Sequence, residues 1–168
     1  IKHDAFLDAD GNSRIVAVWD QLDSDGKPPR EVDPAFPFDF GTLHTNADIA
    51  KMRAGDKPMP DWMRDPQGHG THVAGIAAGR ATANMAAGMA PEAGIVVVIP
   101  AMDVDENRQD PRSLGYSVSH INALQFLKGI ATDNNMLVPD FKPIAINVSL
   151  GMNAGAHDGQ TLLEAAFD

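Results

Sequence analysis

The sequence feature that most constrains the fold is residues 65–79, which read Asp-Pro-Gln-Gly-His-Gly-Thr-His-Val-Ala-Gly-Ile-Ala-Ala-Gly. Proline and glycine interrupt regular structure in its first half. From Thr71 onward the residues are mostly small or apolar, which predicts a buried helix packed closely against its neighbours. The stretch therefore places His69 at the boundary between a turn and a helix.

A histidine at this boundary suits proton transfer. The first turn of a helix leaves backbone N–H groups unpaired, and the imidazole titrates near neutral pH. His69 and His72 also have the spacing of a metal pair, as in a metallohydrolase. However, Gly70 replaces the glutamate of the zinc motif His-Glu-x-x-His, and the chain has no cysteine. The glycine spacing does not fit a dinucleotide-binding loop either.

The rest of the chain alternates between strand and helix patterns. Apolar runs predict strands at 14–19, 95–99 and 142–151, the last two buried on both faces. Near-helical spacing of apolar residues predicts a helix over 116–134, with Ser117 as a candidate cap and His120 packed or on the surface. A further helix is expected to open at His157. This order predicts an α/β domain with a mostly parallel sheet flanked by helices.

Residues 21–67 are rich in proline, glycine and aspartate, and we expect a surface insertion before the histidine stretch. Within it, Thr45 can cap a short helix over 46–54, with Asp48 in its first turn and Gly55 ending it. Aromatic side chains are expected to attach the segment to the body of the domain; they are Phe36, Phe38, Phe40 and Trp62.

Composition excludes several classes of function. The 168 residues fit one domain, and the net charge of −10 repels nucleic acid. No apolar run is long enough to span a membrane, and the first residues do not resemble a signal peptide. Without cysteine there can be no disulfide, zinc–thiolate site or cysteine nucleophile. We expect neither a nucleic-acid partner nor a membrane partner.

Two polar segments have some features of metal sites. Asp8, Asp10 and Asn12 have the spacing of a calcium loop, but Ser13 and Trp19 replace the required glycine and glutamate. A solvated turn is the preferred interpretation. Residues 103–112 are interpreted as a solvated loop. The sequence gives no reason to expect a metal or another cofactor.

Three motifs occur in an order that resembles the subtilisin-like serine peptidases. They are Gly68-His-Gly-Thr-His-Val-Ala-Gly75, Gly88-Met-Ala-Pro91 and Ile144-Ala-Ile-Asn-Val-Ser-Leu-Gly151. The resemblance implies that His69 is the general base and that His72 is structural, tucked into the helix. It also implies that Ser149, Leu150 and Gly151 line the substrate cleft, and Gly115 is a candidate for a second substrate-pairing edge near residues 113–116.

Other parts of the family pattern are missing. Residues 1–6 resemble the segment that follows the family's aspartate motif, and neither that motif nor the serine motif occurs in the chain. Residues 80–86 carry no carboxylate and Ala5 stands where the family often has an aspartate ligand, so its structural calcium site is not expected. We expect the central part of a peptidase domain, incomplete at both ends and inactive by itself.

The alternative is a non-catalytic peptide-binding or assembly module, a pseudopeptidase. In either case the expected partner is a polypeptide, and exposed edges of a partial domain would allow homo-oligomers. An extracellular location is expected only because the family is commonly secreted.

Overall fold

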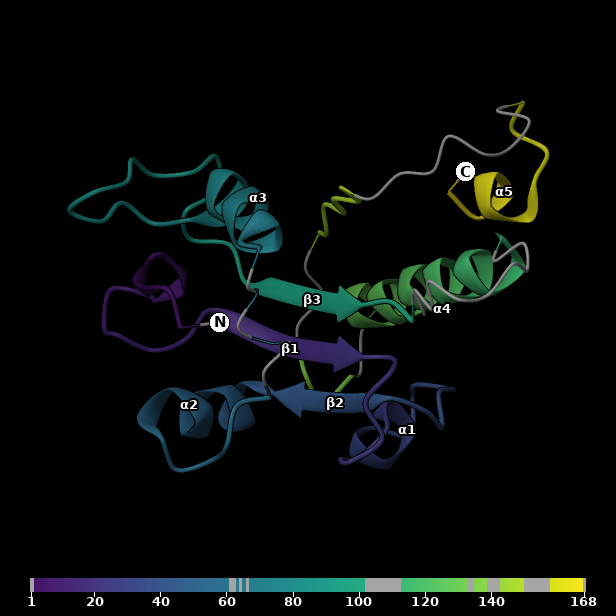
Figure 1. Cartoon of the computed structure of the whole chain (residues 1–168), viewed down its shortest axis with the longest axis horizontal. Helices are drawn as coiled ribbons and strands as arrows, with labels where there is room; N and C mark the ends of the chain where they lie inside the picture. Colours follow the sequence, from purple (N-terminus) through teal and green to yellow (C-terminus); the bar gives the residue numbers. More distant parts are fainter. Residues whose placement is uncertain are drawn as a thin grey trace. The chain divides into compact units, whose positions relative to one another are not determined.

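The computed structural model describes residues 2–60, 63, 65, 67–101, 113–132, 135–138, 143–149 and 158–167. Its sheet has the strand order β2-β1-β3, in which β1 is Ile15–Asp20, β2 is Thr42–Thr45 and β3 is Ile95–Ile99. Figure 1 shows that β1 and β3 run in the same direction and β2 in the opposite one. The sheet is therefore mixed, and the predicted α/β class is confirmed.

The chain divides into two compact units, and each of the three strands has residues in both. The first unit comprises Ile1–Val18 and His44–Val97, and it contains η1 (Asp4–Phe6), α2 (Asn46–Ala54) and α3 (His69–Ala78). The second comprises Trp19–Leu43 and Val98–Asp168, with α1 (Pro29–Val32), α4 (Ser113–Ala131) and α5 (Leu162–Phe167). Each unit is described by itself below.

The structure confirms two of the three predicted strands. β1 and β3 are confirmed to within one residue, but every residue of β3 is only half-buried, so its predicted burial on both faces is wrong. Residues 143–149 are not a strand, and Ile144, Ile146 and Val148 are exposed. An apolar run becomes a strand only where a neighbour pairs its N–H and C=O groups. Within the described residues, no strand pairs with 143–149.

The capped helix predicted over 46–54 is confirmed in detail. The Asp48 N–H donates to Thr45 Oγ1, while Asp48 Oδ2 accepts from the Thr45 N–H at 3.0 Å, which completes a capping box. Gly55 ends the helix in the left-handed conformation with φ of 91°.

Aromatic rings form the core of the second unit. Trp19 lies 4.7 Å from Phe38 and 5.0 Å from Phe126 between ring centroids, and Phe36 lies 4.8 Å from Phe126. These four side chains are almost fully buried, which confirms the predicted packing of Phe36 and Phe38. The surface description of 21–67 is wrong for β2, because Thr42 and Leu43 are buried in the sheet. That the segment is an insertion stays a prediction.

The two C-terminal helices, α4 and α5, start elsewhere than predicted. α4 begins at Ser113, so Ser117 lies inside the helix and is not its cap. Its Phe126 and Ile130 are buried, and His120 is packed with 6% exposure. α5 begins at Leu162, and His157, like 102–112 and Trp62, lies outside the described residues. No helix in the described part of the chain has the length and apolar character to cross a membrane.

Candidate functional site

His69 is the first residue of α3 and its side chain is exposed to solvent. The preceding residue, Gly68, takes the left-handed conformation with φ of 72°, which a glycine adopts without strain. The sequence pattern predicts a helix from Thr71 onward. In the structure this turn starts the helix two residues earlier, at His69. The imidazole is thus held on a regular helix and remains accessible to a substrate, as a proton acceptor requires.

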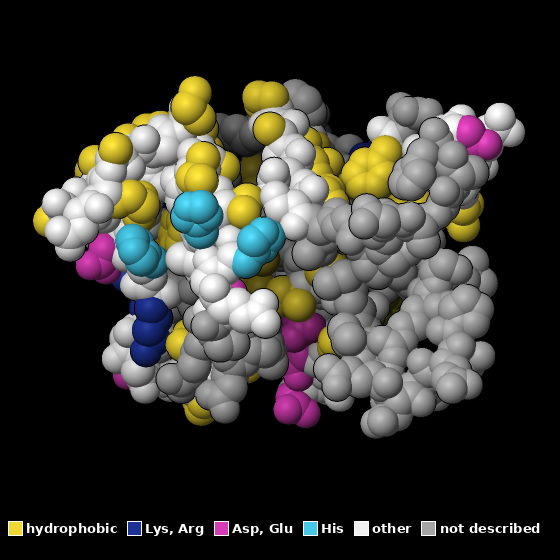
Figure 2. Space-filling view, turned by 45° about the horizontal axis from the view of Figure 1, so that its top comes forward, with side chains coloured by type: hydrophobic (Ala, Val, Ile, Leu, Met, Phe, Trp, Pro, Cys, Tyr) yellow, Lys and Arg dark blue, Asp and Glu magenta, His cyan; other side chains and the backbone are white. Residues whose placement is uncertain are grey.

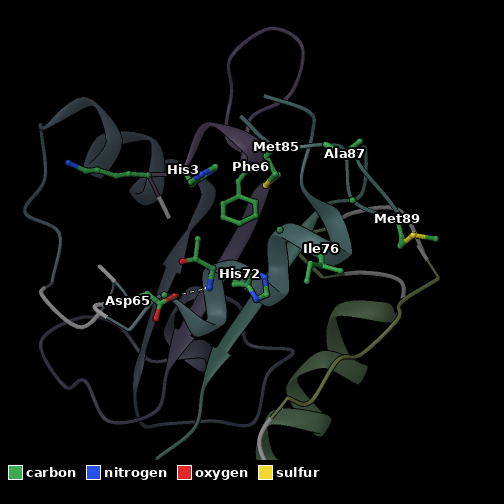
Figure 3. Close-up of a pocket in the computed structure, with 14 residues that line it drawn as sticks. His3, Phe6, Asp65, His72, Ile76, Met85, Ala87 and Met89 are labelled. Atoms are coloured by element: carbon green, nitrogen blue, oxygen red, sulfur yellow. Dashed lines mark hydrogen bonds between the residues drawn. The ribbon is translucent and has the colours of Figure 1, made fainter. Parts of the chain in front are cut away.

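Asp65 holds the start of α3. Its Oδ2 accepts the N–H of Thr71 at 2.7 Å, and its backbone oxygen accepts the N–H of Gly68 (Figure 3). Hydrogen bonds from the Thr71 hydroxyl and N–H lower the pKa of Asp65 below its ordinary value. A carboxylate at a helix N-terminus also complements the helix dipole. The sequence reasoning did not single out Asp65, although an acidic residue shortly before a helix start is a usable signal.

At the other end of α3, all four terminal carbonyl groups accept hydrogen bonds. Such groups have no partner within a helix and must be satisfied from outside. The donors are the N–H groups of Gly79, Met89 and Ala90, which reach the oxygens of Gly75, Ile76 and Ala77 at 2.9–3.0 Å, and Arg14 Nη2, which reaches that of Ala78 at 2.6 Å. Both ends of the helix are therefore fixed.

Gly88 makes this C-terminal arrangement possible. A Cβ atom on Gly88 would lie 2.6 Å from the oxygens of Gly75 and Ile76, closer than carbon and oxygen can approach. Only glycine lets the following segment run along the helix end. This is the physical reason for glycine in the Gly88–Pro91 motif.

An open pocket of about 760 Å³ lies beside α3 within the first unit. Figure 3 shows Phe6, Met85 and Ile76 around it, with His3, Asp65 and His72 among its polar groups. His72 is exposed in the described structure, so the expectation that it is tucked into the helix is wrong. Figure 2 shows histidine and hydrophobic side chains exposed together on one face.

α3 is less covered than its sequence predicts. Among the described residues of the helix only Gly75 is buried, and Ile76 is 58% exposed. Met89, in the adjoining segment, is 88% exposed. The prediction of a buried helix is therefore wrong for the described chain, because η1 and the segment after α3 leave much of its surface open.

The turn at Asp8 is confirmed. Asp8 Oδ1 accepts the N–H groups of Asn12 and Asp10 at 2.8 and 2.9 Å, and these bonds, with that from Asn12 first, lower the pKa of Asp8. Its carboxylate thus closes the turn. Within the described ranges, no three His, Asp or Glu side chains are grouped as a metal site requires.

Comparisons with known proteins show what this chain is similar to. The sequence profile of the Subtilase family matches residues 42–165, which include α3 and all three motifs. The chain belongs to the subtilase family. A solved structure, the CspB protease of Clostridium perfringens, is similar over 99% of this chain with a TM-score of 0.66 and 28% identity. The chain spans 30% of that protein's length, and curated protein sequences gave no match.

Subtilases are serine peptidases, and the residues predicted to serve that chemistry fall in both units of this subtilase chain. His69 belongs to the first unit, and Gly115 and Ser149 to the second. Ser149 is exposed, and its Oγ accepts a hydrogen bond from Asn147 Nδ2 at 2.8 Å. Leu150 and Gly151 lie outside the described residues.

The second substrate-pairing edge is corrected. Residues 113–116 form the first turn of α4, and a helical backbone cannot pair with a substrate strand as the edge of a sheet does. Gly115 lies within this turn, so any contact with substrate would have to take another form.

Proposed function

We propose that this chain is the central part of a serine endopeptidase in which His69 is the general base. The observation that carries the proposal is the exposed imidazole of His69 at the start of α3. This helix is hydrogen-bonded at both ends and lies inside the segment that matches the family. His69 would take the proton of a serine hydroxyl as it attacks the peptide carbonyl. It would then donate that proton to the departing amine.

The isolated chain is expected to be inactive. The mechanism needs a serine nucleophile and a carboxylate that orients the histidine, and neither family motif for them occurs in these 168 residues. When the chain is incubated with a general peptide substrate, any hydrolysis should be unchanged by His69→Ala. Turnover that disappears in His69→Ala would contradict this expectation.

The complete reading frame separates a peptidase from a pseudopeptidase. A peptidase requires that it encode both missing motifs, and a protein expressed from it should hydrolyse peptides. Replacement of either the serine or the aspartate would overturn the proposal and favour the non-catalytic peptide-binding alternative.

Substrate contacts are proposed for residues 149–151. The exposure of Ser149 supports a role in pairing with the backbone of an extended polypeptide, and no strand in the described part of the chain pairs with residues 143–149. In the complete enzyme, Ser149→Pro removes one N–H donor and should raise KM more than it lowers kcat. An unchanged KM would contradict the proposed contact between the Ser149 N–H group and the substrate.

The isolated chain is also proposed to self-associate. Apolar side chains are widely exposed, among them Ile76, Met89, Met136 and Leu162. Light scattering should give a mass that increases with concentration, and a monomer at every concentration would contradict this. An extracellular location is proposed from family habit alone, and recovery of the protein in the culture medium rather than in cells would test it.

A further inference from the structure

Arg14 has an unusual environment for a charged residue. It directly precedes β1 and is 8% exposed, and its guanidinium donates to four backbone oxygens. Nε reaches Leu7 at 3.1 Å, Nη1 reaches Ala93 at 2.6 Å, and Nη2 reaches both Ala5 at 2.8 Å and Ala78 at 2.6 Å. All of these residues belong to the first unit.

These bonds need an arginine. Burying a cation costs free energy unless its donors are satisfied, and here each nitrogen of the guanidinium has an acceptor. The planar group spreads its donors in a fixed fork, whereas a lysine has one nitrogen and cannot reach four separated oxygens in the same way. Burial lowers the pKa of Arg14, but a guanidinium keeps its charge at neutral pH. Its charge also complements the C-terminal end of α3.

The acceptors link three segments that are distant in sequence. Ala5 and Leu7 belong to or follow η1, Ala78 ends α3, and Ala93 precedes β3. The backbone oxygen of Ala5 also accepts the N–H of Arg80, just after α3, at 2.8 Å. Arg14 therefore joins the end of α3 to the two segments that flank it.

We propose that Arg14 is a positioning residue that sets the direction of α3 and so the place of His69. A helix of this length is rigid over about 15 Å, so a shift at its last turn is carried to its first. Asp65 holds the first turn, and Arg14 holds the last. The inference rests on the proposed role of His69, but its first test does not depend on activity.

The first test is amide hydrogen exchange in the 168-residue chain. Arg14→Met should speed exchange about tenfold or more at Met89 and Ala90, and also at Thr71 in the first turn. The amide of Met136, bonded to Asp33 at 2.6 Å in the second unit, reports general destabilisation. Arg14→Lys keeps the charge and should give the same pattern more weakly, so it carries the test if Arg14→Met does not fold.

Arg80→Met is the matched control. It removes the same charge from the same unit, but Arg80 is bonded to the largely exposed Glu92, and it should leave exchange at Thr71 unchanged. Faster amide exchange at Met89 and Ala90 alone would mean that Arg14 only caps the end of the helix. Equal acceleration at Met136 would show general destabilisation, and either result would overturn the inference.

The second test uses the enzyme expressed from the complete reading frame. Arg14→Lys should lower kcat about tenfold or more while KM stays within about twofold, because a displaced base slows proton transfer without changing uniform binding. If His69→Ala keeps full activity, the proposed function fails whatever the exchange data show. If His69→Ala is inactive but Arg14→Lys has a normal kcat, only the positioning role of Arg14 is overturned.

Discussion

The aromatic core of the second unit and the neighbourhood of α3 in the first are stabilised in different ways. In the second unit, buried aromatic rings of Trp19, Phe36, Phe38 and Phe126 contact one another. At the end of α3, in the first unit, the contacts are polar, because Arg14 and backbone amides donate to the carbonyl groups of the helix. The second unit is stabilised mainly by apolar area, and the neighbourhood of α3 by hydrogen-bond geometry.

This difference indicates which substitutions each of the two regions tolerates. Apolar packing accepts changes of shape when the volume is conserved, so the second unit should respond to lost volume. A hydrogen-bonded helix end is sensitive to any displacement of its donors and acceptors. The neighbourhood of α3 should therefore respond to single added atoms as well as to lost ones.

The largest effect is expected in the aromatic core. Phe126→Ala removes a fully buried ring that contacts Trp19 and Phe36, and it should lower the free energy of unfolding by about 3–5 kcal/mol. Urea denaturation followed by tryptophan fluorescence measures this change. Phe40→Ala is the control, since Phe40 is 40% exposed and should cost less. An equal loss in both variants would mean that burial does not govern the second unit.

A smaller effect is expected from one added methyl group in the first unit. Gly88→Ala places a Cβ 2.6 Å from two backbone oxygens of α3 and should lower the free energy of unfolding by about 1–3 kcal/mol. Gly70→Ala is the matched control, because its nearest atom, Asp65 Oδ2, is 3.6 Å away. Equal stability of the two variants in urea would contradict the close approach at Gly88.

A pH-dependent effect is expected at the start of α2. Burial alone would raise the pKa of Asp48, but hydrogen bonds from Lys57 and Thr45 outweigh it and lower the pKa to about 2. The carboxylate therefore stabilises the fold fully above its unfolded pKa near 3.8, and this contribution is lost as pH falls toward 2.

The measurement is the urea midpoint of the wild type and Asp48→Asn across this range. Near neutral pH the variant should be less stable by roughly 1 kcal/mol, since the group is partly exposed. The difference should shrink between about pH 4 and pH 2. A difference that stays constant over that range would exclude ionised Asp48 as its source.

The smallest effect is expected at an exposed ion pair of the second unit. Arg30 and Asp39 are 49% and 65% exposed, so Asp39→Asn should change the free energy of unfolding by only about 0–1 kcal/mol. Thermal unfolding in low and high salt measures the change. A loss comparable to that of Phe126→Ala would show that charge, not apolar packing, stabilises the second unit.

Local patterns in the sequence predicted the elements well. β1, β3, the capping box of α2 and the helix of the histidine stretch all depend on residues close together in the chain. The strand predicted over 142–151 failed within its described part because pairing depends on another strand, which no local pattern supplies. The exposure of α3 was not predicted either, because it depends on which distant segments of the chain cover the helix.

The contacts that hold the candidate site were also missed. The acceptors of Arg14 lie between 7 and 79 residues away, and an arginine before a strand gives no sign of them. His69 was predicted because its motif is contiguous, whereas Asp65 needed the turn geometry of the residues that follow it. The sequence therefore predicted His69 as the candidate proton acceptor but not the residues that fix its helix.

The most direct measurement is the rate of peptide hydrolysis by the protein expressed from the complete reading frame, compared with His69→Ala and His72→Ala. Both histidines are exposed and close in sequence, so the pair separates a catalytic role from a general effect on the helix. His69→Ala should lower kcat by at least about 10³-fold, and His72→Ala should lose far less. Equal activity of the wild type and His69→Ala would contradict the account.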